Sequence, residues 1–165
     1  MKRFEHVMRT AAVCIAALLL AAPPAAAQSS APPQTASAPD AAKKPHRLIL
    51  QVNTNDPAMM NLALNNATNV EQYYKDIGEK VEIEVVTFGP GLNMLRDDTS
   101  PVKDRIKAIS EKMPSISFMA CGNTQENMHK AENKKIPLIA QATLVKSGVV
   151  RVMELQEEGW TYVRP

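Results

Sequence analysis

Short apolar segments alternate with amphipathic ones over the last 120 residues of the chain. The apolar segments have the length and composition of buried strands, and the amphipathic ones repeat their apolar residues at helical spacing. Strands are predicted at 47–53, 81–88, 116–120, within 138–145 and at 160–163, and helices at 57–78, 92–96, 101–112, 124–133 and 149–158. Strands that alternate with helices form a mostly parallel sheet with right-handed crossovers and helices on both faces. We therefore expect an α/β fold, a doubly wound three-layer sandwich of about five strands with flavodoxin-like or Rossmann-like topology.

Residues that favour particular turns and caps set several of these boundaries. Asp56 is a predicted N-cap, and Pro57 after it suits the first turn of a helix. The segment Gly89–Gly91 (GPG) predicts a sharp turn directly after the second strand. Asn123 with Glu126 three residues later predicts a capping box at the start of a helix.

Three predicted loops follow the carboxyl ends of predicted strands, at 53–57, 89–91 and 121–123. In an open parallel sheet these ends share one edge, and ligands bind outside that edge. We therefore expect a site there, with Asn53, Gly89 and Gly91 among its walls.

The first 27 residues have the three parts of a secretory signal peptide. Lys2, Arg3 and Arg9 make the start basic, an apolar run covers 11–22, and the small residues Ala25–Ala27 form a cleavage site. A membrane span needs about 20 apolar residues, so no stable membrane anchor is expected. We expect cleavage near Ala27 and delivery to the periplasm or the exterior.

Residues 28–45 are mainly Ala, Pro, Ser and Gln, a composition that cannot bury enough surface to fold. They are predicted to be a disordered linker, and 46–165 a single folded domain. The full chain has 19 Lys+Arg and 17 Asp+Glu. Cleavage removes three of the basic residues and one acid, which leaves 16 of each. This balance gives no basic surface for nucleic acid.

One cysteine remains after cleavage, because Cys14 lies inside the signal and Cys121 is the other. An internal disulfide is therefore excluded. Cys121 follows a predicted strand and precedes a predicted helix, where free N–H groups and the helix dipole favour a thiolate. The alternative is a buried cysteine that acts only as a small apolar side chain.

Other chemistry around Cys121 is weakly supported. His129 is predicted more than a turn along the helix, as a solvated residue. A copper site could combine Cys121 and His129 with Met119 and Met128, but methionines of this chain fit core helix faces. Gly89–Gly91 lacks the spacing of a phosphate-binding loop. We expect no metal and no cofactor.

Four asparagines lie on the first predicted helix, although asparagine is a poor helix former. Asn65 and Asn69 are four residues apart and share a face. We expect them to form structural hydrogen bonds with neighbouring loops or with a second copy of the chain, and exposure to solvent is the alternative.

Five segments resemble the DsrE/DsrF-like family, and more closely its exported or single-domain members. They are LALNNATN (62–69), VEIEVVTFGPGLNML (81–95), SPVKDRI (100–106), FMACGNT (118–124) and EEGWTYVRP (157–165). The resemblance covers nearly all of 46–165. It implies a compact α/β sandwich, a homo-oligomer between dimer and hexamer, and a role in sulfur relay. The family's cysteine at a strand's carboxyl end, which carries a persulfide, corresponds to Cys121.

The leading expectation is thus an exported sulfur-handling or thiol-exchange protein, a sulfurtransferase-like carrier whose nucleophile is Cys121. The amides of Gly122, Asn123 and Thr124 would stabilise its anion, and its partner would be a sulfur donor or acceptor protein or a small sulfane-sulfur compound. Two alternatives stay open. One is a non-catalytic oligomeric binding or scaffold module with a structural cysteine, and the other is a metal or redox sensor.

Overall fold

Strands and helices alternate along residues 44–165, which are the residues that the computed structural model describes. The predicted signal peptide (1–27) and nearly all of the predicted linker (28–45) lie outside these residues. The elements are β1 His46–Val52, α1 Pro57–Asp76, β2 Val81–Thr87, the 3-10 helix η1 Gly89–Leu95, α2 Lys103–Lys112, β3 Ile116–Cys121, α3 Gly122–Glu132, β4 Ala142–Val145, α4 Gly148–Glu157 and β5 Thr161–Val163. None of the helices in this part of the chain is long and apolar enough to cross a bilayer.

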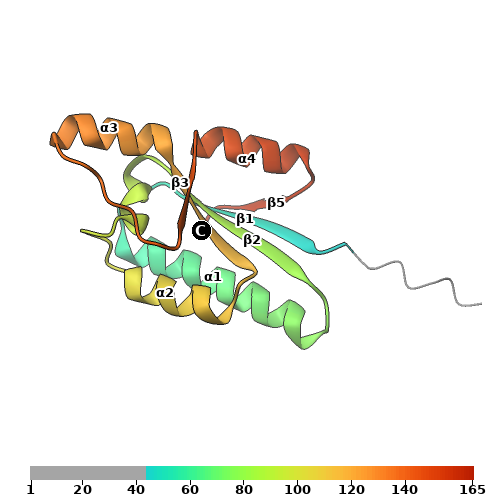
Figure 1. The fold of residues 1–165 in the computed structure, drawn as a ribbon. Coiled ribbons are helices and arrows are strands. Elements are labelled where there is room, and N and C mark those ends of the chain that lie inside the picture. The colour runs from blue at the N-terminus through green and yellow to red at the C-terminus, as the bar shows by residue number, and fades with distance from the viewer. Residues whose placement is uncertain (1–43) are drawn as a thin grey trace, which may run out of the picture. The chain divides into compact units, whose positions relative to one another are not determined.

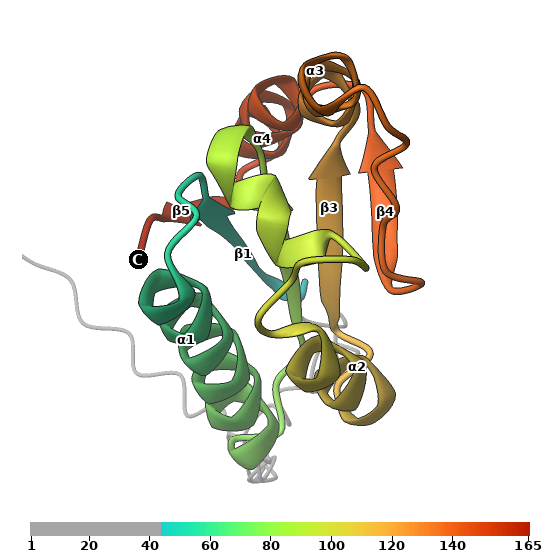
Figure 2. The same ribbon diagram turned by 90° about the vertical axis from the view of Figure 1, so that its left-hand side faces the viewer.

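The five strands form one sheet in the order β4-β3-β2-β1-β5, and every neighbouring pair is parallel. The chain adds β2, β3 and β4 in turn on one side of β1 and then returns across the sheet to place β5 on the other side. Helices α1 and α2 cover one face, and α4 covers the opposite face (Figures 1 and 2). The predicted α/β fold class is confirmed.

Strand side chains alternate between two apolar layers, as the pleat of a strand requires. The larger layer joins β1, β2 and β3 to α1, α2 and η1, and its strand members include Leu50, Val52, Ile83, Val85, Phe118 and Ala120. The smaller layer lies under α4 and consists of Ile49, Val86, Met119, Val152 and Leu155. Both faces of the central strands are therefore buried, which explains why the sequences of these strands are nearly continuous apolar runs.

The predicted start of α1 is confirmed. Asp56 is its N-cap and accepts a hydrogen bond from the N–H of Ala58 (2.8 Å), and Pro57 occupies the first helical position. Helix α2 begins at Lys103, two residues later than predicted.

The predicted capping box at Asn123 is wrong. β3 continues to Cys121 and α3 begins at the next residue, Gly122, so Cys121 itself holds the N-cap position. The N–H of Asn123 donates to the carbonyl of Lys146 (3.1 Å). This N–H at the start of α3 therefore needs no side-chain cap. The predicted turn at Gly89–Gly91 is also revised, because these residues are the first part of η1.

The helix asparagines divide into two kinds. The side-chain carbonyls of Asn61 and Asn65 accept hydrogen bonds from the guanidinium of Arg105 in α2. Asn65 therefore forms a hydrogen bond within the fold, although its partner lies in helix α2 and not in a loop or a second copy, and the residue is exposed. The side chain of Asn69 has no hydrogen bond to any residue within 44–165.

Candidate functional site

The three loops at the carboxyl edge of the sheet are joined by hydrogen bonds. The amide of Asn93 donates to the side-chain carbonyl of Asn55 (2.8 Å), which ties η1 to the loop after β1. The N–H of Gly89 donates to the hydroxyl oxygen of Thr124 (3.0 Å), which ties the start of η1 to the first turn of α3. Cys121 ends β3 between these loops.

Two helices begin beside Cys121. Helix α3 starts at Gly122, directly after Cys121, and α4 starts at Gly148, 27 positions after Cys121. Their first turns lie next to each other and the helices run in opposite directions from that point (Figure 1). Both helix N-termini therefore direct free N–H groups and the positive ends of their dipoles toward one region.

The sulfur of Cys121 lies where these groups converge. Burial disfavours its thiolate, but the Thr124 hydroxyl and the N–H groups of Gly148 and Thr124 favour the thiolate and outweigh burial. The net effect is that the pKa of the Cys121 thiol lies below its ordinary value. The site thus favours a negative charge on sulfur.

Gly148 is a member of this site that sequence reasoning missed. A Cβ atom there would lie 2.9 Å from Phe88 Cδ1 and 3.3 Å from the Cβ of Cys121, so only glycine lets α4 start this close to the sulfur. Gly122 has a related role, since its Cβ would lie 3.1 Å from the carbonyl oxygen of Val145. The sequence shows a glycine directly after the predicted cap Ser147, but it does not show that this start of α4 lies beside Cys121.

The hydroxyl of Thr124 is held in one orientation. Its oxygen accepts from the Gly89 N–H, which leaves its proton available for the Cys121 sulfur. Thr124→Val is therefore expected to slow alkylation of the native thiol by iodoacetamide about tenfold at neutral pH, because a hydrogen bond to a charged group contributes about 1.5–3 kcal/mol. The second-order rate is measured against pH.

The matched control is Thr124→Ser, which keeps the hydroxyl and is expected to react at close to the wild-type rate. Equal rates and equal pH profiles for Thr124→Val and the wild type would show that the hydroxyl does not act on the sulfur.

Access to the sulfur is narrow in the isolated chain, because Cys121 is only 4% exposed. Two grooves flank the first turns of α3. One, of about 500 Å³, lies between η1 and α3 and includes Gly89 and Thr124. The other, of about 390 Å³, includes Gly122 and Leu144. Each groove lies beside the first turn of α3, but Cys121 lines neither of them.

The remaining predicted residues lie apart from the sulfur. Asn53 lines a small cavity with Thr54 and Arg164. Gly91 packs against the backbone of Val52, so its role is close packing. His129 is exposed, and its Nδ1 lies 2.8 Å from the carbonyl of Lys134. Within residues 44–165 no group of three or more His, Cys, Asp or Glu side chains is placed to hold a metal ion.

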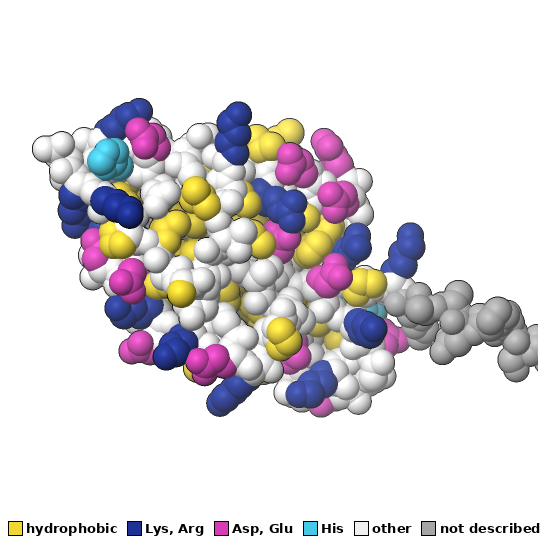
Figure 3. Space-filling model, in the orientation of Figure 1, with side chains coloured by type: hydrophobic (Ala, Val, Ile, Leu, Met, Phe, Trp, Pro, Cys, Tyr) yellow, Lys and Arg dark blue, Asp and Glu magenta, His cyan; other side chains and the backbone are white. Residues whose placement is uncertain are grey.

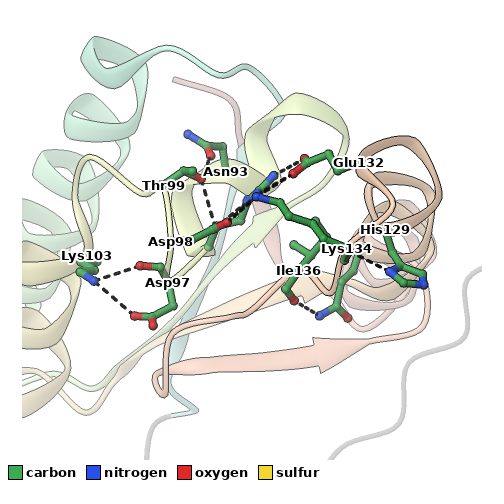
Figure 4. Close-up of polar contacts among 11 residues, drawn as sticks. Asn93, Asp97, Asp98, Thr99, Lys103, His129, Glu132, Lys134 and Ile136 are labelled. Carbon is green, nitrogen blue, oxygen red and sulfur yellow. Dashed lines mark hydrogen bonds and ion pairs between the residues drawn. The ribbon is translucent and has the colours of Figure 1, made fainter.

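An ionic network fixes the far end of α3 to the segment after η1 (Figure 4). The guanidinium of Arg96 is nearly buried and donates to both oxygens of Asp98 (2.9 and 2.8 Å) and to both carboxylate oxygens of Glu132. Lys134 pairs with the same two acids (3.2 and 3.3 Å). Hydrogen bonds from Arg96 hold the pKa of Asp98 and that of Glu132 below their ordinary values.

This network matters because no side chain of α3 is fully buried, and Met128 is only partly buried against the larger apolar layer. The position of α3 is also set by Arg96 at one end, by Thr124 at the other, and by the amide of Gln125, which donates to the carbonyl of Ile136 (2.8 Å). Sequence reasoning missed these contacts because Arg96 and Glu132 are 36 residues apart and neither belongs to a motif.

These elements define an α/β protein with a parallel five-stranded sheet. A buried cysteine lies at the carboxyl edge of the sheet, in surroundings that favour its thiolate form. No family model matches the sequence, and no curated protein is similar to it. Among solved structures, a protein of unknown function, MTH1491 from Methanobacterium thermoautotrophicum, is similar with 29% identity and a TM-score of 0.62. The similarity covers 73% of this chain and 99% of that one, so the two proteins share a fold.

Proposed function

We propose that this chain is a sulfur-handling or thiol-exchange protein that acts through Cys121, as its resemblance to the DsrE/DsrF-like family implies. The observation that carries the proposal is the position of Cys121 at the N-cap of α3 and against the first residue of α4. There the Thr124 hydroxyl and nearby N–H groups lower the pKa of the thiol. A structural cysteine needs no such donors. A thiolate that attacks sulfur does, because the thiolate is the nucleophile.

The proposed step transfers one sulfur atom and needs no external oxidant. The Cys121 thiolate attacks the outer sulfur of a donor persulfide, R–S–SH. A new S–S bond forms, the donor's S–S bond breaks, and the electron pair leaves with the donor as RS⁻. The products are a Cys121 persulfide and a thiolate, and the same donors then hold the charge of the persulfide.

The proposal includes export of the chain and its assembly into a homo-oligomer of between two and six copies. Cleavage near Ala27 would deliver residues 28–165 to the periplasm or the exterior, where Cys121 is the only cysteine. A sulfur acceptor there would receive the outer sulfur by the reverse exchange.

Intact mass spectrometry tests the proposal. Residues 28–165, incubated with inorganic polysulfide, are expected to gain the mass of one or more sulfur atoms and to lose it on reduction. Cys121→Ser is expected to gain none. A wild-type chain without the added mass, or a Cys121→Ser variant with the same added mass, would contradict the role of the cysteine.

A second candidate is an oligomeric binding or scaffold module with a structural cysteine. Two observations favour it: the 4% exposure of Cys121 and a group of exposed apolar side chains on β4 and α4. These are Leu144, Val149, Val150 and Met153. Hydrophobic side chains lie open over α4 among charged ones (Figure 3). A native thiol that resists both polysulfide and iodoacetamide in a stable oligomer would favour this function.

A further inference from the structure

A second cavity lies at the edge of the sheet opposite Cys121. It has a volume of about 360 Å³, is open to solvent on one side and is lined by the C-terminal half of α1 and the first residues of β1, with β2 and β5 contributing one residue each. In Figure 1 this is the end of α1 that lies near the start of β1. The proposed thiol site uses none of these residues, so the cavity needs an explanation of its own.

Aromatic rings form one wall of the cavity. Tyr74 stacks on the ring of His46, with centroids 4.0 Å apart and planes at 17°. Tyr73 meets Tyr74 edge-on at 5.3 Å and is itself 61% exposed. Val70 and Val81 add apolar surface. A flat ring that enters this space finds both face and edge partners in arrangements that aromatic pairs prefer.

Two polar side chains in the cavity lack partners. Asn69 and Thr161 both line it and are exposed to solvent, and neither side chain has a hydrogen bond to another residue within 44–165. Asn69 is the more informative, because an asparagine inside a helix costs stability and its neighbour Asn65 bonds Arg105 instead. A few polar groups that are free to bond a ligand, beside apolar and aromatic surface, are what a small-molecule site requires.

The charged groups of the cavity are already paired. Arg47 donates to Glu82 (3.1 Å) and lies over the ring of Trp160. His46 Nε2 lies 2.7 Å from Glu79. A charged ligand would have to displace one of these partners, whereas an uncharged ligand would not.

We propose that this cavity binds a small, uncharged, planar aromatic molecule of one or two fused rings. The ring stacks on Tyr73 and meets Tyr74 edge-on, and a ring N–H or O–H group donates to the side-chain carbonyl of Asn69. The size follows from the volume, which is near the lower end of ligand pockets. This inference does not rest on the proposed function, since Cys121 takes no part in it.

Ligand-observed NMR with the full chain tests the proposal. Indole is the probe, cyclohexanol the non-planar control, and indole-3-carboxylate the charged one. We expect saturable binding of indole, at least tenfold weaker binding of the carboxylate, and no saturable binding of cyclohexanol. Tyr73→Ala removes an exposed wall residue and is expected to weaken indole binding at least fivefold. Val70→Trp fills the space and is expected to abolish it.

Tyr162→Ala, which removes a tyrosine outside the cavity, and Cys121→Ser are expected to bind indole as the wild type does. The proposal is overturned if indole does not saturate, if cyclohexanol binds equally well, or if Tyr73→Ala and Val70→Trp both leave indole affinity unchanged.

Discussion

Gly91→Ala is expected to destabilise the fold by about 3 kcal/mol, near the upper end of overpacking penalties. A Cβ at this position would lie 2.2 Å from the carbonyl oxygen of Val52 and 2.7 Å from the Cα of Asn53. Both are backbone atoms at the end of β1, so no side chain can move aside. The strand end or η1 has to shift, and η1 buries three apolar side chains that would shift with it. Urea unfolding of both proteins measures the difference.

Gly78→Ala is the matched control. Gly78 has a φ of +72°, but a Cβ there would meet nothing within 4 Å. Its expected cost is only the left-handed backbone penalty of about 1 kcal/mol. Equal losses for Gly78→Ala and Gly91→Ala would show that η1 can move away from β1 at little cost.

Arg96→Met is expected to destabilise the fold by about 2 kcal/mol, because the nearly buried guanidinium loses charge-assisted hydrogen bonds to two carboxylates that are partly exposed and can be hydrated. Glu132 would keep its ion pair with Lys134, and Asp98 would keep Lys134 and the Thr99 hydroxyl (3.4 Å). Since no side chain of α3 is fully buried, its C-terminal end should loosen first. Chemical unfolding gives the stability, and hydrogen exchange of the α3 amides locates the change.

The control for Arg96→Met is Lys130→Met, which removes an exposed pair with Glu126 one helical turn away. Its expected effect is about 0.5 kcal/mol or less. A loss for Arg96→Met as small as that would mean that α3 is held by other contacts.

The same network makes stability depend on pH. The pKa values of Asp98 and Glu132 are lowered in the folded chain, so the unfolded chain binds protons more readily. Their contribution is fully present above the ordinary carboxyl pKa, about 4, and is lost as pH falls further through the folded values. We expect the wild type to lose stability below about pH 5, and Arg96→Met to lose less over the same range.

The order of elements and the shared edge of three loops could be predicted, because both follow from local patterns and from the rules of parallel sheets. The same patterns place Cys121 at a strand end next to a helix start. The predicted start of that helix is two residues too late, since nothing local shows that the Asn123 N–H has a partner at Lys146.

Contacts between distant segments were beyond sequence reasoning. Gly148 reaches Cys121 only because β4 lies next to β3 and α4 then turns back over the sheet. The depth of Cys121 also depends on that packing, as does the pairing of Arg96 with Glu132. Periodicity reports which face of an element is apolar, but not which element covers it.

The position of Gly148 couples the charge of the thiol to the edge of the sheet. Residues 146 and 147 alone connect it to β4, an edge strand of four residues. Any displacement of β4 would make the sulfur easier to reach, but it would also withdraw the N–H of Gly148 and make the thiol harder to ionise. Greater exposure of Cys121 would therefore come with a weaker tendency to form the thiolate.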